Sequence, residues 1–473
     1  MTCNRLTLTF SLAALIISVI AQTPDLVIEI FRHGARGPLK NTYNPNQTYW
    51  GDNLGQLTPI GMRMHYLLGA ALRNQYSELL TSYGPDTIYV RSSDYNRTIM
   101  SGYSHMYGVY ETYGPNFTST NNVSAAIPPY VSPYISELVA DLSTTSALPN
   151  NFQVVPIHVV PYNEDILIAP YGPACAMAKN WSAADYASPE TKSLFKHDMK
   201  DIVTYLRNQG LTVRNFKDLF FVGDTAIANM VEGIELPGNV DPVTQEQYYK
   251  DLKFAYEWYT TQTIEGTPNQ VELFALNLLD FISGNINATI NGTSSLNFIF
   301  LSGHDTTVLA LLSAFNITTA DCLLDNYRND KNGLPIETPN CIYPQFAANL
   351  IFEFYNTEEP YVLFYYNGTQ VPFCGNSNNN CTYKQFQSYI TQVTGGLTPA
   401  DYVQMCSLTQ LPIPTTSDTD SFKAALIAVA IVAFVLVTLL SVMAFRMYKR
   451  NKELQKQAVL LSNQSQSMLA IVS

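Results

Sequence analysis

The chain has 473 residues, 47% of them hydrophobic and 12% aromatic, which is enough for a large domain with a well-formed core. Its net charge is −12, and residues 22–420, which precede the second hydrophobic end segment described below, hold 19 basic and 37 acidic residues, a net charge of about −18. So acidic a surface argues against nucleic acid and anionic membrane surfaces as partners. The composition also excludes a low-complexity chain.

Residues 1–21 form the first hydrophobic end segment. They hold one Arg and then an apolar run that ends in Val19, Ile20 and Ala21. A short apolar run that closes on a small residue is typical of a secretory signal peptide, here cleaved before Gln22.

The second hydrophobic end segment, residues 424–445, carries no charge and is long enough to cross the hydrocarbon layer of about 30 Å as a helix. Basic residues follow it and stay on the cytosolic side: Arg446, Lys449, Arg450, Lys452 and Lys456. We therefore expect a single-pass type I membrane protein with a lumenal or extracellular domain over 22–412, a polar stalk over 413–423 and a cytosolic tail over 446–473.

Sequons and cysteines agree with an oxidising, extracytosolic compartment. N-x-[ST] sequons begin at Asn46, Asn96, Asn116, Asn122, Asn180, Asn287, Asn291, Asn316, Asn367 and Asn380. Cys3 leaves with the signal peptide, and the six remaining cysteines permit fifteen sets of disulfides. Short spacing favours Cys374–Cys381 and Cys322–Cys341, which leaves Cys175–Cys406. No C-x-x-C occurs, which argues against a structural zinc site.

Strand and helix patterns alternate in the first part of the domain. Residues 25–34, "DLVIEIFRHG", and 86–94, "DTIYVRSSD", read as strands, the second ending at Arg91. Leu57–Leu80, which starts with Thr-Pro, and residues 95–110 have apolar residues at helical spacing. The alternation predicts an α/β fold with a parallel-rich sheet that binds ligands beyond the carboxyl ends of its strands.

The middle of the chain is different in character. Strand signals thin out between about residues 110 and 290, which predicts an inserted, mostly helical cap. A strand resumes with 296–305, "LNFIFLSGHD", and residues 345–356 and 360–370 then predict a closing hairpin.

Three predicted strand ends carry charged groups that could meet: Arg32, His33 and Arg36 in "FRHGARGP"; Arg91; and His304 with Asp305. Guanidinium groups present planar donors that suit a phosphate or carboxylate. Arginines beside His33 lower its pKa, so neutral imidazole can act as a nucleophile on phosphorus. Asp305 can supply a proton to the leaving alkoxide. Taken singly, these residues could be surface charges or a solvated loop pair; the combination favours a phosphoryl-transfer site.

R-H-G-x-R-x-P at 32–38, "VRSSDYNRTIMS" at 90–101, "PIHVVPYNEDILIAPYGPAC" at 156–175 and "LSGHDTTVLALL" at 301–312 together carry a resemblance. The sequence resembles the histidine acid phosphatases, branch 2 of the histidine phosphatase superfamily, including its lysosomal and prostatic members. The motifs occur in the right order over most of the domain, and the single span with a short tail also resembles the lysosomal members.

The resemblance implies a phosphoglycerate-mutase-like mixed sheet core flanked by helices, with an inserted helical cap and no metal or other cofactor. It implies that His33 is the nucleophile that becomes phosphorylated and that Asp305 is the proton donor. The phosphate-binding residues would be Arg32, Arg36, Arg91 and His304. The sequence also departs from these relatives in two places. Ala35 and Gly37 stand where relatives usually carry Asp and Ser. The pairing of Cys322 with Cys341 departs from the cysteine placement of vertebrate members, whereas the other two pairings fit that placement.

The remaining histidines are expected to be structural. His65 and His158 are interpreted as structural or supporting residues, and His105 and His197 as core or surface residues. Asp94 and Arg97 are expected to orient Arg91 through local hydrogen bonds, outside the phosphate site.

We therefore expect an acid phosphatase that acts on small phosphate monoesters or phosphoproteins in a lysosome or at the cell surface. Two alternatives stay open: a membrane-tethered binding protein that has kept the fold and lost turnover, and a phytase-type phosphatase. The mutase branch resembles the chain in R-H-G but lacks the full loop motif and the His-Asp pair. A homodimer is an open alternative to a monomer.

Overall fold

The computed structural model describes residues 22–42, 49–118, 126, 146–238, 240–266, 270–375 and 380–406. The chain divides into two units, Met1–Leu408 and Thr409–Ser473, and every described residue belongs to the first. The predicted signal peptide, stalk, membrane span and cytosolic tail all lie outside the described residues.

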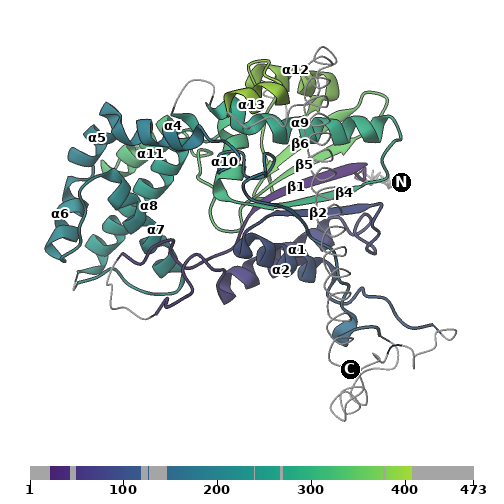
Figure 1. The fold of residues 1–473 in the computed structure, drawn as a ribbon, viewed down its shortest axis with the longest axis horizontal. Coiled ribbons are helices and arrows are strands. Elements are labelled where there is room, and N and C mark those ends of the chain that lie inside the picture. The colour runs from purple at the N-terminus through teal and green to yellow at the C-terminus, as the bar shows by residue number, and fades with distance from the viewer. Residues whose placement is uncertain are drawn as a thin grey trace, which may run out of the picture. The chain divides into compact units, whose positions relative to one another are not determined.

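A mixed sheet of eight strands forms the centre of the fold, in the order β3-β2-β4-β1-β5-β6-β7, with β8 beside β6 (Figure 1). The strands are β1 Leu26–Arg32, β2 Ile88–Ser93, β3 His158–Val160, β4 Phe298–Gly303, β5 Asn349–Tyr355, β6 Tyr361–Tyr366, β7 Thr369–Gln370 and β8 Cys381–Thr382. Strands β3, β2, β4 and β1 run parallel, and β5 and β6 are antiparallel to their neighbours. The predicted strands and the closing hairpin form, although β2 continues to Ser93, beyond its predicted end at Arg91.

The register of the parallel strands places the two histidine motifs at one edge. Arg32, the last residue of β1, lies opposite Gly303, the last residue of β4. His33 and His304 therefore leave the sheet side by side, at the carboxyl ends of neighbouring strands, where α/β sheets bind ligands.

Helices cover both faces of the sheet because its central strands are apolar on both sides (Figure 1). Helices α1 (Pro59–Gln75) and α2 (Asn96–Tyr110) pack on the face that holds Val27 and Phe31. On the face that holds Ile28 and Ile30, the sheet is covered by α9 (Gln270–Ile290), α10 (Asp305–Ala314), α12 (Tyr383–Val393) and α13 (Pro399–Met405). Thr58 caps α1 by accepting a hydrogen bond from the Gly61 amide, as its Thr-Pro start predicts.

A helical lobe lies beside the sheet and has its own hydrophobic cluster around the fully buried Trp258 (Figure 1). Its helices are α4 (Ala178–Ala187), α5 (Pro189–Lys196), α6 (Lys200–Asn208), α7 (Phe216–Val231), α8 (Pro242–Glu265) and α11 (Ala320–Lys331). Helix α9 falls within the range predicted for the cap but packs on the sheet, whereas α11 comes from later in the chain and joins the lobe.

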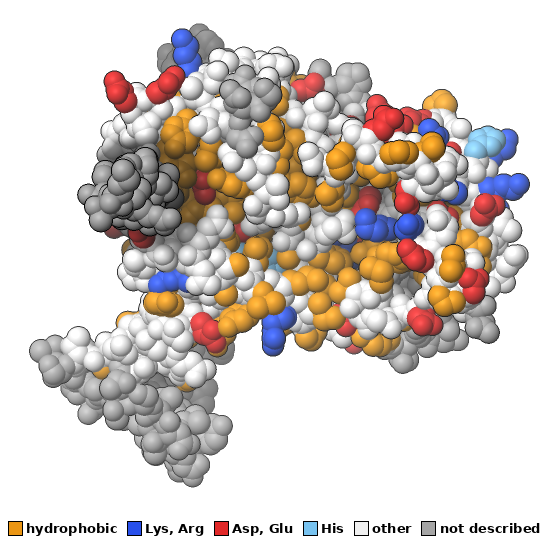
Figure 2. Space-filling view, turned by 180° about the vertical axis from the view of Figure 1, so that it is seen from behind, with side chains coloured by type: hydrophobic (Ala, Val, Ile, Leu, Met, Phe, Trp, Pro, Cys, Tyr) orange, Lys and Arg blue, Asp and Glu red, His pale blue; other side chains and the backbone are white. Residues whose placement is uncertain are grey.

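The surface of the helical lobe carries acidic and basic side chains close together (Figure 2). Lys250 lies 3.1 Å from Asp330, and Arg328 lies 3.0 Å from Asp198. Exposed pairs of this kind contribute little to stability, so the buried aromatic cluster holds the lobe together.

Helix α9 is the one helix within the described ranges that is long and apolar enough to cross a membrane. Half of its most apolar stretch is buried, and the helix packs against the sheet, as a core helix does. The span predicted over residues 424–445 lies outside the described residues.

Three disulfides form in the pairing that spacing favours: Cys175–Cys406, Cys322–Cys341 and Cys374–Cys381. The first joins the start of the helical lobe to the end of α13. The second forms although its placement departs from that of vertebrate histidine acid phosphatases, and it ties α11 to the segment that precedes β5.

Candidate active site

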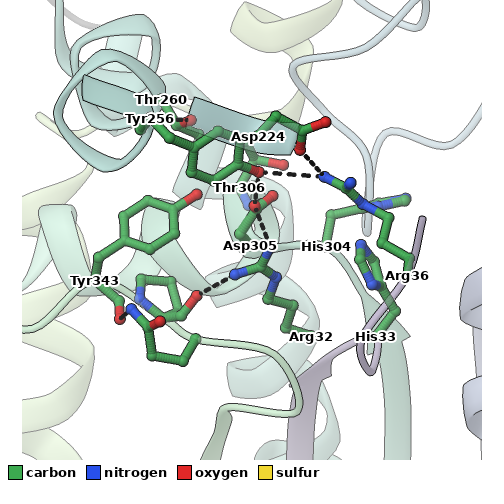
Figure 3. A network of polar contacts seen from close by, with 12 residues as sticks. Arg32, His33, Arg36, Asp224, Tyr256, Thr260, His304, Asp305, Thr306 and Tyr343 are labelled. Atoms are coloured by element: carbon green, nitrogen blue, oxygen red, sulfur yellow. Dashed lines mark hydrogen bonds and ion pairs between the residues drawn. The ribbon is translucent and has the colours of Figure 1, made fainter. Parts of the chain in front are cut away.

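A pocket opens at the carboxyl edge of β1 and β4, between the sheet and the helical lobe. His33, Arg36, Arg97, His304 and Asp305 line its base. Helix α10 begins at Asp305, so the positive end of its dipole and its free N–H groups favour an anion there. The charged side chains come together from different elements (Figure 3).

His33 is held as a neutral base with one nitrogen free. Its Nδ1 lies 2.8 Å from the carbonyl oxygen of Gly34, which can only accept, so Nδ1 carries the proton and Nε2 keeps its lone pair. Burial, and next Arg97, Arg32 and Arg36, hold the pKa of His33 well below its usual value. The imidazole therefore stays unprotonated in mildly acidic solution.

The loop after β1 packs so closely on the start of α1 that it requires a glycine. A Cβ atom at Gly34 would lie 2.3 Å from the carbonyl oxygen of Gly61. The Thr58 amide donates to the carbonyl of Ala35 over 2.9 Å and fixes the loop against the helix. This contact leaves His33 little freedom to move, which suits a nucleophile.

Arg32 and Asp305 form a buried ion pair with 3.0 Å between Nη2 and Oδ2. Arg32 also donates to the carbonyl oxygen of Pro344 over 2.7 Å, and the Tyr256 hydroxyl donates to Asp305 over 2.7 Å. Burial alone would raise the pKa of Asp305, but Arg32, Tyr256 and Arg36 outweigh it and hold that pKa well below its usual value. Asp305 is therefore a carboxylate in this arrangement.

Arg36 is oriented by an acidic residue of the helical lobe that the sequence analysis did not identify. Its Nη2 lies 2.8 Å from Oδ1 of Asp224, on α7, and 3.4 Å from the Tyr256 hydroxyl. The other carboxylate oxygen of Asp224 accepts from the Leu39 amide over 2.6 Å. Asp224 thus joins the lobe to the loop after β1 and fixes the guanidinium of Arg36.

His304 lies between Ser93 and Arg97. Its Nε2 is 2.9 Å from the Ser93 hydroxyl, and its Nδ1 is 3.4 Å from Nη2 of Arg97. Burial, and next Arg97, lower the pKa of His304 well below its usual value. The arrangement aims an arginine and an imidazole at the same side of the pocket.

The placement predicted for Arg91 is wrong, and Arg97 occupies the pocket instead. Strand β2 runs on to Ser93, so Arg91 lies within the strand, short of the edge. Its Nη2 pairs over 2.5 Å with the fully buried Asp165, whose carboxylate also accepts from the amides of Leu167 and Ile168. Arg91 is not among the described residues that line the pocket, whereas Arg97, in the first turn of α2, is.

The motif "VRSSDYNRT" that carries the resemblance contains both arginines, so the motif alone does not distinguish them. The position of Arg97 beside a helix start was the available signal. The first turn of a helix that follows a strand's carboxyl end faces the ligand edge of the sheet.

Four histidines lie outside the pocket, and two of them are buried in the core. His65 is buried and its Nε2 donates to the backbone carbonyl of Arg32 over 3.0 Å, so it supports the end of β1. His105 is buried in the core, while His158 and His197 are exposed. Within the described ranges, no group of three or more His, Cys, Asp or Glu residues is arranged to hold a metal ion.

The family model described as "Histidine phosphatase superfamily (branch 2)" matches residues 25–367, the range that holds both histidine motifs and the whole pocket. The chain belongs to this superfamily. Human lysosomal acid phosphatase is 27% identical over 442 residues, covering 90% of this chain and 89% of the relative. Human prostatic acid phosphatase is 26% identical over 424 residues, covering 85% and 93%.

Solved structures of lower identity share the histidine phosphatase fold. Hafnia alvei phytase in complex with tartrate matches with a TM-score of 0.52 at 15% identity and covers 80% of this chain and 98% of that one. The apo form of the same enzyme matches with a TM-score of 0.50 at 17% identity, covering 78% and 97%. At such identities the likeness concerns the arrangement of sheet and helices alone.

Proposed function

We propose that the protein is an acid phosphatase that hydrolyses phosphate monoesters through a covalent phosphohistidine intermediate. The observation that carries the proposal is the state of His33: its Nε2 keeps a lone pair while Arg32, Arg36 and Arg97 approach the same ring. Because the pKa of His33 is lowered, the nucleophile remains available at the pH of an acidic lumen.

In the first half of the reaction, Nε2 of His33 attacks phosphorus and the bond from phosphorus to the ester oxygen breaks. Arg36, Arg97 and His304 lie around the pocket base, where they can hold the equatorial phosphate oxygens and stabilise the charge that develops on them. The ester oxygen leaves on the side opposite His33 and takes a proton from Asp305, which gives the free alcohol.

Asp305 needs a proton before it can act as the acid, and binding of the substrate raises its pKa so that it can take one up. Before substrate binds, Arg32 keeps Asp305 ionised through their 3.0 Å pair. A phosphate group that enters beside Arg32 shares its positive charge and adds negative charge next to the carboxylate, and both effects raise the pKa of Asp305. In acidic solution the carboxylate then takes up a proton from solvent.

In the second half, water attacks phosphorus of the phosphohistidine. The carboxylate of Asp305, now deprotonated, accepts the proton of that water while the bond from phosphorus to Nε2 breaks. Inorganic phosphate leaves and His33 returns to its neutral form. One residue thus serves as acid and then as base, as microscopic reversibility allows.

The test measures hydrolysis of an alkyl phosphate and of 4-nitrophenyl phosphate between pH 3 and 8. It compares the full-length protein with its variants His33→Ala and Asp305→Asn. We expect an acidic optimum, no turnover for His33→Ala, and a loss of about 10²- to 10⁴-fold for Asp305→Asn on an alkyl phosphate. The loss should be smaller on 4-nitrophenyl phosphate, whose leaving group needs no proton. An acid-labile, base-stable phosphoenzyme should be trapped in rapid-quench experiments, and turnover retained by His33→Ala would rule out the mechanism.

Two alternatives receive less support. A binding protein without turnover has no use for a free Nε2 opposite a carboxylate that is held by Tyr256 and Arg32. A phytase-type enzyme must hold further phosphate groups, yet Arg36 and Arg97 are the cationic residues among the described pocket lining, and both face the base.

The compartment and topology belong to the same proposal. Its support is the signal-peptide pattern of residues 1–21, the uncharged stretch over 424–445 with basic residues after it, and the three disulfides. We place the catalytic domain in the lumen of a lysosome or at the cell surface, tethered by one helix.

A further inference from the structure

We propose that the leaving-group side of this pocket is an aromatic subsite that selects phosphate monoesters of planar aromatic alcohols. The inference rests on the proposed phosphatase function and adds the substrate class. Its residues are the cap group, Tyr186, Phe220, Tyr256 and Tyr259, and the loop group, Tyr162 and Tyr171, all of which line the pocket.

In-line attack fixes where the leaving group must lie. If His33 approaches phosphorus from the base, the ester oxygen lies opposite it, beside Asp305. Tyr256 reaches Asp305 from the helical lobe over 2.7 Å, and Tyr171 reaches Thr307, two residues further along α10, over 3.3 Å. The group attached to the ester oxygen therefore enters the space between the cap group and the loop group.

The cap group is a continuous series of ring contacts. Phe220 stacks on Tyr256 with 5.1 Å between ring centroids and lies 5.3 Å from Tyr259. Tyr186 in turn stacks on Tyr259 at 4.2 Å. Phe220 and Tyr186 are half-buried, so the series keeps apolar ring surface open to the pocket.

The loop group faces the pocket from the segment before α4. Tyr162 packs edge-on against Tyr95 at 4.5 Å between ring centroids, and Tyr95 packs edge-on against His304 at 5.3 Å. Tyr162 and Tyr171 are half-buried as well. Aromatic rings therefore enclose the leaving-group space from two elements, which suits a flat ring that can stack or meet them edge to face.

Charge complementarity points to the same class of ligand. Beyond the phosphate-binding base, the described lining adds only uncharged groups, among them the hydroxyls of Ser182, Thr260 and Thr263. A polyanionic leaving group would meet no cationic residue in this part of the described lining to offset its desolvation. A neutral aromatic alcohol pays little desolvation free energy when it enters this space, and it gains contacts with the rings.

The test compares phenylphosphonate with methylphosphonate as ligands of the full-length protein, by calorimetry and as competitive inhibitors. Both carry the same phosphonate group and neither can be hydrolysed, so leaving-group reactivity plays no part. We expect phenylphosphonate to bind roughly tenfold more tightly or better. In the double variant Phe220→Leu and Tyr186→Leu the preference should fall to about threefold or less, with methylphosphonate binding unchanged.

Leucine keeps an apolar side chain of similar size at these half-buried positions, which limits the loss of packing, while it removes the rings. The matched control is Tyr103→Leu, an exposed aromatic residue on α2 that lies outside the pocket lining, and it should leave both ligands unaffected. Equal affinity of the wild-type protein for the two phosphonates, or equal losses for both in the double variant, would overturn the subsite.

Measuring ester hydrolysis beside phosphonate binding distinguishes failure of the aromatic subsite from failure of the phosphatase function. Hydrolysis of phenyl phosphate and of glycerol 2-phosphate without a phenylphosphonate preference would keep the phosphatase and reject the subsite. A clear phenylphosphonate preference without hydrolysis of either ester would keep the aromatic subsite and reject the phosphatase.

Discussion

Arg91 and Arg97 stand six positions apart and show how a single residue's place in the fold decides its role. Arg97 approaches His304 at 3.4 Å and lines the pocket, and its guanidinium lies over the Tyr95 ring at 4.4 Å. Arg91 neutralises the buried Asp165. Arg97 should therefore contribute to phosphate binding, and Arg91 should contribute to the stability of the fold.

Replacing Arg97 with Ala should weaken inhibition by inorganic phosphate roughly 10- to 100-fold, the amount expected for a lost hydrogen bond to a charged group. The midpoint of urea unfolding should change little. Replacing Arg91 with Leu should leave phosphate inhibition nearly unchanged and lower stability. The substitution leaves the charge of Asp165 buried without its cationic partner, at a cost of about 3–5 kcal/mol in the free energy of unfolding.

Phosphate inhibition constants and urea titrations of the same two variants measure both effects. The double variant Arg91→Leu and Asp165→Leu is the control, because removing both charges should recover much of the lost stability. If Arg91→Leu weakened phosphate binding more than Arg97→Ala did, the assignment would have to be reversed.

At this scale the sequence predicted the residues that stand directly at strand ends and no others. Arg32 ends β1, His33 follows it, and His304 and Asp305 follow β4, so their place at the ligand edge of the sheet follows from the strand pattern. Asp224 lies almost two hundred residues away from Arg36, on a helix whose own pattern is that of an ordinary core helix. Only the packing of the lobe on the sheet brings it there.

Among the elements, the segment between α11 and β5 supports Arg32 through direct contacts. Pro344 accepts the hydrogen bond of Arg32, and the Phe346 ring lies 4.3 Å from its guanidinium carbon. The Cys322–Cys341 disulfide ties this segment to α11 of the helical lobe. The bridge therefore limits the movement of the groups that hold Arg32.

Replacing Cys322 and Cys341 together with Ser should raise KM for phosphate esters several-fold while kcat changes less, because Arg32 loses its fixed support. The closed loop spans 19 positions, and opening it should also lower the free energy of unfolding by about 3 kcal/mol. Steady-state kinetics and urea unfolding would measure the two effects.

The matched control is the double Ser variant of Cys374 and Cys381, whose bridge closes a loop of 7 positions beside β8, far along the sheet from the pocket. It should lose stability with KM unchanged. Equal KM values for both disulfide variants would remove the positioning role of Cys322–Cys341.

The sequence predicted the type of each element whose apolar residues recur at a regular spacing. It was less able to predict which other elements each one packs against. The strand patterns and the Thr-Pro helix start fixed β1, β2, β4 and α1 because both depend on local residues. Helix α9 is apolar along most of its length, and such a pattern does not tell a lobe helix from one that covers a sheet. Its packing on the sheet depends on contacts that are distant in sequence.

For the whole molecule, the burial of ionisable groups around one pocket ties stability to pH. His33, His65 and His304 are buried, and burial holds the pKa of each well below its usual value. In the unfolded chain each would bind a proton near pH 6.5. As pH falls below about 6.5, the unfolded chain gains protons that the folded one does not, so the free energy of unfolding decreases.

Asp305 acts in the same direction at lower pH. Its folded pKa lies well below the unfolded value because Arg32, Tyr256 and Arg36 outweigh the effect of burial. Its contribution to stability is present above about pH 3.9 and is lost as pH falls further toward the folded pKa. Bound phosphate should offset part of both losses, because a ligand of the folded state stabilises that state in proportion to its occupancy.

We therefore predict that the free energy of unfolding falls between pH 7 and pH 4.5 and that inorganic phosphate recovers part of the loss. His65→Gln should make the fall less steep by up to about 1.4 kcal/mol per pH unit, since one proton is removed from the linkage. The Gln amide can still donate to the carbonyl of Arg32, so the end of β1 keeps its support. Urea titrations at pH 7, 5.5 and 4.5 measure the slopes, and an unaltered slope for His65→Gln would mean that His65 already takes up its proton in the folded protein.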